Sequence, residues 1–174
     1  MEKWSLDKGH SVLEFRVKHM MISNVKGLFE DFDVEVTGDP KDLASIKINV
    51  SIAVDSITTK NEPRDQHLKS EDFFNSASYP KITFSSREIE DLGKQRYAID
   101  GDLSIKGQHR PIRLEVYHGG SGIDPWGNKK IGFSVTGKIK REDFGLTWNT
   151  ALEAGGVMVS SEVRFDAELQ FVLA

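Results

Sequence analysis

Residues 157–171, at the C-terminal end of the chain, alternate between apolar and polar side chains. The odd positions are mostly apolar, whereas the even positions carry mainly Ser, Glu, Arg, Asp and Gln. Successive side chains of a strand point to opposite faces of a sheet, so this pattern predicts a strand with one apolar face. At ~15 residues the strand spans ~50 Å, which suits a curled, closed sheet better than a flat one. We therefore predict a barrel with the odd positions turned inward.

Seven other segments alternate in the same way, and most of them are longer than an average strand. Turn-forming residues separate them, at Gly38-Asp39-Pro40, Leu92-Gly93, Lys106-Gly107 and between Gly119 and Gly127. With the C-terminal segment they predict a single all-β domain of eight long strands over residues 1–174. The seven segments are residues 13–19, 32–36, 46–54, 82–84, 97–105, 112–116 and 131–139.

One region does not alternate. Residues 62–70 carry Pro63 near their start, and Asn61 or Thr59 precedes them as a capping residue, which predicts a short helix. The adjacent Phe73 and Phe74 lie among acidic residues. We expect this helix and the segment after it to form a lid between two strands, across one end of the barrel.

Composition excludes several classes of function. The formal net charge is -4 and the pI is about 5.7, which argues against a nucleic-acid partner. The absence of cysteine excludes disulfides and thiolate sites. Residues 1–7 lack the basic and apolar regions of a secretion signal, and no later segment is apolar enough for a membrane span. We expect a cytoplasmic protein, or a periplasmic or secreted one if a signal was removed.

Small residues at inward positions allow two interpretations. Gly101 and Gly137 lie in the middle of predicted strands, where glycine either permits a bend at a barrel corner or leaves room for a guest molecule. Ser161 and Ala167, which we also expect to face inward, favour the second interpretation slightly.

Histidine is the usual acid–base and metal-binding residue, and two of the five histidines, His19 and His118, have inward positions. They could meet across a barrel. The chain has no His-x-His or His-Glu-x-x-His motif, and a hydrogen-bonded role in the core or at the rim is favoured over a metal site. Phosphate-loop, dinucleotide and nucleophile-elbow motifs are also missing, so we predict no cofactor, no metal and no catalytic residue.

Two polar clusters stand out. Residues 64–67, Arg-Asp-Gln-His, either fix their own segment through ion pairs and hydrogen bonds or present Arg64 or His67 to an anionic ligand group. Residues 141–146 predict a turn that leaves the preceding strand at Lys140, with Phe144 closing one end of the barrel.

The chain resembles the YceI-like family of polyisoprenoid-binding proteins from about Trp4 to its C-terminus. The resemblance implies an extended, antiparallel, lipocalin-like barrel, a homodimer, and an isoprenoid or alkyl chain held in an internal tunnel. The motifs that carry it are Asp7-x-x-His10-Ser11-x-x-x-Phe15-x-Val17-x-His19, Val25-x-Gly27-x-Phe29, Arg64-Asp65-x-His67-Leu68-x-Ser70-x-Asp72-Phe73-Phe74, Tyr79-Pro80-x-Ile82-x-Phe84-x-Ser86, Gly101-x-Leu103-x-Ile105-x-Gly107 and Arg141-x-Asp143-Phe144-Gly145.

We therefore expect a protein that binds a long-chain isoprenoid or related amphiphilic lipid for carriage, storage or sensing. An enzyme that uses an inward His19 or His118 on an apolar substrate is the alternative, and a filled barrel that serves only as an interaction module is a third. Candidate ligand-binding residues are Phe15, Val17, Ile52, Phe84, Phe133, Gly137, Val159 and Phe165 on the wall, Leu68, Phe73, Phe74 and Phe144 at an end, and His19, Arg64 and His67 near a head group.

Overall fold

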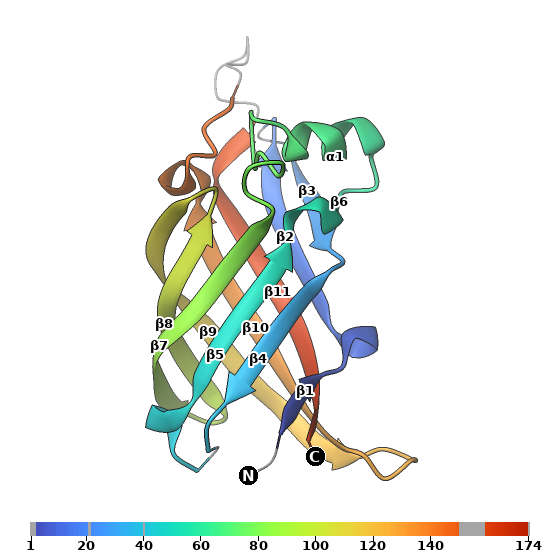
Figure 1. Cartoon of the computed structure of the whole chain (residues 1–174), viewed down its shortest axis with the longest axis vertical. Coiled ribbons are helices and arrows are strands. Elements are labelled where there is room, and N and C mark those ends of the chain that lie inside the picture. Colours follow the sequence, from blue (N-terminus) through green and yellow to red (C-terminus); the bar gives the residue numbers. More distant parts are fainter. Residues whose placement is uncertain (1–2, 21, 40, 150–158, 174) are drawn as a thin grey trace.

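The computed structural model describes residues 3–20, 22–39, 41–149 and 159–173, which form one antiparallel sheet of eleven strands curled into a barrel (Figure 1). The strands are β1 (Trp4–Leu6), β2 (Val12–His19), β3 (Ser23–Phe29), β4 (Phe32–Thr37), β5 (Lys47–Ala53), β6 (Ile57–Thr58), β7 (Lys81–Gly93), β8 (Arg96–Ile105), β9 (Gln108–Ile123), β10 (Lys129–Lys140) and β11 (Val159–Leu173). The helices are α1 (Glu62–Lys69) and the 3₁₀ turns η1 (Lys8–His10), η2 (Leu43–Ser45), η3 (Val54–Ser56) and η4 (Arg141–Phe144).

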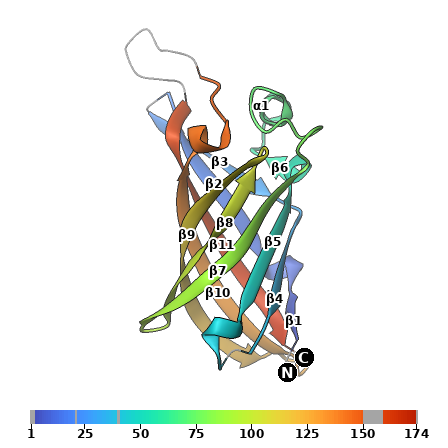
Figure 2. The same cartoon turned by 60° about the vertical axis from the view of Figure 1, so that its left-hand side comes forward.

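The predicted all-β, antiparallel, lipocalin-like barrel is confirmed, although the described sheet has three strands more than the eight expected. The strand order is β4-β5-β7-β8-β9-β10-β11-β2-β3-β6, and β1 pairs with β11. The eight predicted segments are the run from β4 to β2. Because β6 follows β5 closely in the chain but pairs with β3, it brings the β3–β6 end of this order near the β4–β5 end (Figure 2).

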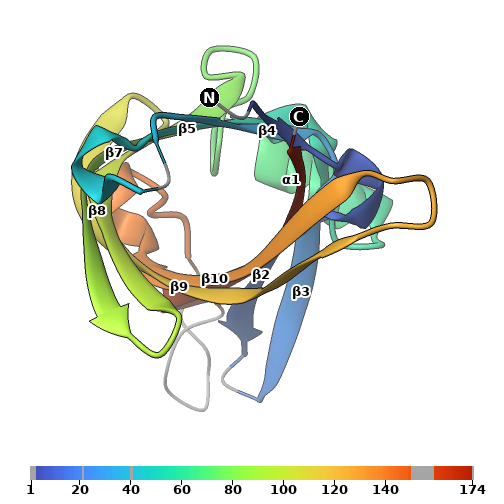
Figure 3. The same cartoon turned by 90° about the horizontal axis from the view of Figure 1, so that it is seen from below.

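The predicted loop between Gly119 and Gly127 is wrong in its first half. β9 continues to Ile123 and pairs with β10, and the turn lies at Asp124–Asn128, where the Asp124 carboxylate accepts hydrogen bonds from the backbone N–H groups of Trp126 and Asn128. These charge-assisted bonds hold the turn. The extended β9–β10 hairpin projects beyond the ring of strands seen from below (Figure 3).

The alternation of the C-terminal strand is interrupted near its start. β11 pairs with β2 at Val159 and again from Val163, with a register shift between them that indicates a bulge. Ser161, expected inward, is exposed there and donates a hydrogen bond to Glu142. From Val163 onward the odd residues do face the interior, whereas residues 157 and 158 lie outside the described residues.

At the N-terminal end, Asp7 anchors the first strand to the barrel. Its carboxylate accepts hydrogen bonds from Lys130 at 2.6 Å and from His10 at 2.9 Å. The hydrogen bond from Lys130, followed by the one from His10, lowers the pKa of Asp7 below its usual value of 3.8. The interaction therefore stabilises the fold above that value and is lost as the pH falls through the lower, folded-state pKa.

We expect Asp7→Asn to lower the Tm near neutral pH and to lose this effect in acid. The gap in Tm between wild type and variant should be full above about pH 4 and should close on further acidification. Thermal melts across this range measure it, with Asp39→Asn, on an exposed turn, as the control. An equal gap at all pH values would contradict the assignment.

Candidate functional site

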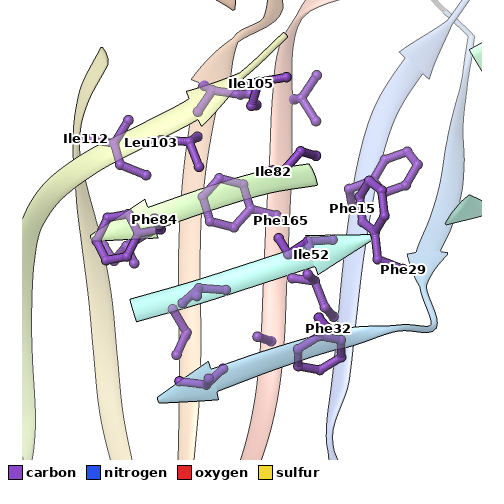
Figure 4. Close-up of a pocket in the computed structure, with 18 of the residues that line it drawn as sticks. Phe15, Phe29, Phe32, Ile52, Ile82, Phe84, Leu103, Ile105, Ile112 and Phe165 are labelled. Carbon is purple, nitrogen blue, oxygen red and sulfur yellow. The ribbon is translucent and has the colours of Figure 1, made fainter. Parts of the chain in front are cut away.

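The inward faces of the strands enclose an apolar cavity of about 780 Å³ that runs along the barrel. This volume lies in the range of ligand pockets, ~300–1,000 Å³. Figure 4 shows aromatic and aliphatic side chains from strands on different sides of the barrel pointing into the same space, among them Phe15, Phe32, Ile52 and Phe165. The barrel is therefore not filled by its own side chains.

The structure places most of the sequence-predicted residues on the wall of this cavity. Gly137 and Phe144 are not among the lining residues, although Phe144 is almost fully buried. For the residues that do line the cavity, contact with a ligand stays a prediction. Those that line the cavity are Phe15, Val17, His19, Ile52, Arg64, His67, Leu68, Phe73, Phe74, Phe84, Phe133, Val159 and Phe165.

Gly137 has a different role from the one expected, because a phenylalanine ring occupies the space that its missing side chain leaves. Gly137 pairs with Phe165 across β10 and β11, and an added Cβ would lie 2.6 Å from Phe165 Cε2. Gly27 faces the Phe15 ring in the same way, and Gly101 the Phe84 ring. Close approach to glycine lets large rings lie along the wall, which leaves the centre of the barrel open.

Helix α1 lies across one end of the barrel, which we call the α1 end (Figure 1). Asn61 caps it by accepting a hydrogen bond from Arg64 N, with Pro63 in the first turn as predicted. The buried Asp65 accepts from the backbone N and the hydroxyl of Thr59, and Arg64 donates from Nε to the same hydroxyl, at 2.7 Å, and from Nη2 to Thr59 O. The cluster thus fixes its own segment, through Thr59.

An aromatic group beside α1 includes a residue that sequence reasoning missed. The His67 ring packs edge-on against Phe73 at 5.1 Å and against Trp148 at 4.8 Å, measured between ring centroids. Asp72 lies 2.8 Å from His67 Nε2 and orients the ring. Trp148 follows η4 in a segment without strand alternation, so no periodic signal marks it as part of the wall.

Arg141 ties the segment after η4 to the start of β11. Arg141 is 2% exposed, and its guanidinium donates to the backbone carbonyls of Leu146, Trp148, Val159 and Ser160. Burial lowers the pKa of Arg141, and the Glu142 carboxylate, 3.9 Å away, raises it. Arginine nonetheless stays charged in proteins, so a cation is fixed at the edge of the cavity.

Among the described residues that line the cavity, one titratable side chain is the phenol of Tyr97, six are basic, and none is Asp or Glu. Five belong to the α1 end. Val159, whose carbonyl accepts from Arg141, pairs with His19, and Trp148 joins Arg141 to His67. His118 lies at the opposite end, beside Phe133. These basic residues are Lys18, His19, Arg64, His67, His118 and Arg141.

The two inward histidines therefore do not meet, which corrects that expectation. His19 pairs with Val159 at the α1 end, whereas His118 packs beside Phe133 at the opposite end of the cavity. In the described part of the chain, no group of three or more potential metal ligands occurs, and no helix is long and apolar enough to cross a membrane.

A curled antiparallel barrel around an apolar cavity defines the class of β-barrels that bind hydrophobic ligands. The model of the YceI-like domain matches residues 4–171. The chain therefore belongs to the YceI-like family.

Relatives support this assignment over the whole chain. A UPF0312 protein of Staphylococcus epidermidis is 41% identical over 172 residues, 98% of each chain, and one of Staphylococcus aureus is 42% identical over 175 residues, 100% of this chain and 99% of its own.

Solved structures show the same fold. The YceI protein of Campylobacter jejuni has a TM-score of 0.76 at 35% identity, covering 99% of this chain and 98% of its own, and BcnA of Burkholderia cenocepacia has 0.82 at 25%, covering 95% and 98%. A polyisoprenoid binding domain from Saccharophagus degradans, implicated in plant cell wall breakdown, has 0.72 at 17% identity, covering 100% of both chains.

Proposed function

We propose that this protein binds one long-chain isoprenoid or related amphiphilic lipid inside the barrel and carries, stores or senses it. The observation that carries this proposal is the apolar cavity of about 780 Å³, with aliphatic and aromatic side chains from strands all around the sheet. The likeness in fold to a polyisoprenoid binding domain supports the choice of ligand class.

Burial of the chain supplies the binding free energy. Each buried CH₂ contributes roughly 0.8 kcal/mol, so about twenty carbons contribute on the order of 15 kcal/mol before costs. Ordering a flexible chain and losing free motion offset a large part of this, which leaves an expected Kd between micromolar and nanomolar.

The α1 end suits an anionic head group of such a lipid. Arg64 is held by Thr59 and has no carboxylate within ion-pair distance among the described residues, and the buried Arg141 is bound mainly by backbone carbonyls. An excess of fixed positive charge at one end of an apolar cavity favours an anionic head group there.

Native mass spectrometry of freshly purified protein, followed by organic extraction, tests the proposal directly. We expect a co-purifying lipid of defined mass with a long apolar chain. If no lipid co-purifies, and geranylgeranyl phosphate and geranylgeraniol give neither binding heat nor a shift in Tm, the proposal is wrong.

A substitution at Ala167 tests the position of the ligand. Ala167 is small, buried and on the cavity wall, so the ring of Ala167→Phe projects into the cavity. We expect affinity for geranylgeraniol to fall at least about tenfold with a loss of stability of about 1–3 kcal/mol or less, because the cavity accepts the ring. Titration calorimetry and denaturant melts measure both. Glu168→Phe, on the exposed face of β11, is the control, and unchanged affinity in Ala167→Phe would place the ligand elsewhere.

A further inference from the structure

Two side chains of the cavity wall each carry a polar atom that is buried without a hydrogen-bond partner among the described residues. These atoms are Trp4 Nε1 and His118 Nε2. A buried polar atom without a partner carries a desolvation penalty, and such atoms are few in native proteins. Two of them in one apolar cavity point to a partner that the protein itself does not supply.

Both atoms belong to the end of the barrel opposite α1, which we call the β1 end. The Trp4 ring stacks on Phe133 with centroids 6.0 Å apart, and the His118 ring lies 5.2 Å from the same Phe133. Phe171 packs edge-on against Trp4 at 5.6 Å. The two polar rings are therefore positioned by one aromatic cluster.

The backbone also fixes these side chains. Trp4 pairs with Leu173 in β1 and β11, and His118 N donates to Gln95 O at 2.9 Å. The β9–β10 register shifts between Gly132 and Phe133, immediately after the pairing of Phe133 with His118. Bulges of this kind set the direction of a side chain, so the imidazole and the indole are held in place before any ligand arrives.

The two atoms define the chemistry of the partner. An indole N–H only donates, whereas an imidazole nitrogen donates or accepts according to its tautomer. A ketone oxygen can accept from either atom, and an alcohol can accept from Trp4 or donate to His118. The permanently charged residues of the wall lie at the α1 end, so an ionised group at the β1 end would be buried without a permanent counter-charge.

We propose that Trp4 and His118 form a second polar subsite of the cavity, which hydrogen-bonds an uncharged alcohol or ketone oxygen of the bound lipid. This inference rests on the proposed function, because it assumes that a lipid occupies the barrel. It adds that the lipid is oxygenated at the end that reaches β1.

The three tryptophans provide a test by NMR, because the indole N–H proton of each one gives a separate signal. These signals report on three regions of the protein. Trp4 lies at the β1 end, Trp148 at the α1 end, and Trp126 is exposed at the tip of the β9–β10 hairpin. Trp4→Phe assigns the signal. We expect geranylgeraniol to move the Trp4 signal downfield. The hydrocarbon with the same skeleton but no hydroxyl should not cause this shift. The Trp126 signal should not move with either probe.

A matched pair of variants tests the energetics. His118→Phe keeps the ring but removes its nitrogens, so affinity for geranylgeraniol should fall about tenfold while that for the hydrocarbon is kept. The Tm of the ligand-free variant should not fall, because a buried unpaired nitrogen is removed. Tyr117→Phe, half-exposed on the outer face of the same strand, should change neither affinity.

The outcomes separate the two proposals. If both probes bind but the alcohol does not shift the Trp4 signal, or shifts that of Trp148 instead, the subsite is wrong and lipid binding stands. If His118→Phe loses affinity for both probes equally, this result also contradicts the subsite. If neither probe binds to the wild-type protein, lipid binding and the subsite fail together.

Discussion

Replacing Arg141 by Met should lower the free energy of unfolding by about 3–5 kcal/mol. The change leaves the carbonyls of Leu146 and Trp148 without the donor that Arg141 supplies, and the carbonyl of the buried Leu146 is out of easy reach of water. Chemical denaturation monitored by circular dichroism measures the loss. Because Trp148 then loses its tie to β11, the tryptophan emission spectrum of the folded variant should shift to longer wavelength.

Two further substitutions isolate the role of the guanidinium. Arg141→Lys keeps the charge but offers one compact ammonium in place of a planar fork, so most of the loss should remain. Lys140→Met, exposed and adjacent in the chain, should stay within about 0.5 kcal/mol of wild type. A loss below about 1 kcal/mol for Arg141→Met would show that other contacts hold this segment.

Gly137→Ala should cost about 1–3 kcal/mol of stability, although alanine usually suits a strand better than glycine. The new Cβ overlaps the Phe165 ring and lies 3.0 Å from Leu114 Cδ2, so the ring has to move into the cavity. Affinity for geranylgeraniol should therefore fall together with stability. Denaturant melts and titration calorimetry on the same preparation measure the two effects.

The same strand offers a control of opposite sign. At Gly132 an added Cβ meets only Leu169 O, at 3.9 Å, so Gly132→Ala should be neutral or slightly stabilising. Combining Gly137→Ala with Phe165→Leu should recover part of the loss, because the smaller side chain can turn away. If Gly137→Ala is as stable as the wild type, the position of the Phe165 ring does not depend on glycine at residue 137.

Strand faces were predictable from the sequence because the two-residue period is a local property of the chain. The odd positions of β11 face inward from Val163 onward, as alternation indicates. The prediction failed at Ser161 because a bulge changes the register, and pairing with a distant strand decides a bulge. β3 was overlooked because Gly27 and the adjacent Leu28 and Phe29 break its alternation of apolar and polar residues.

The site was harder to predict, because alternation shows which residues face inward but not whether they fill the interior. The open cavity depends on rings that lie against glycines of neighbouring strands, as Phe165 does on Gly137. Register alone brings such pairs together. The proximity of Trp4 to Phe133 and His118 likewise joins β1 to the β9–β10 hairpin, which lies far from it in the chain, and Trp148 lies outside any regular pattern.

The position of β11 has a consequence for the synthesis of the chain. This strand lies inside the sheet, between β10 and β2, and also holds β1, yet it comes after all other strands in sequence. As the chain leaves the ribosome, β10 and β2 keep unpaired edges until residues 159–173 have emerged. The barrel therefore cannot close before the last strand is made. A stalled chain that lacks this strand exposes two unpaired strand edges, which can bind chaperones or pair with other copies of the chain.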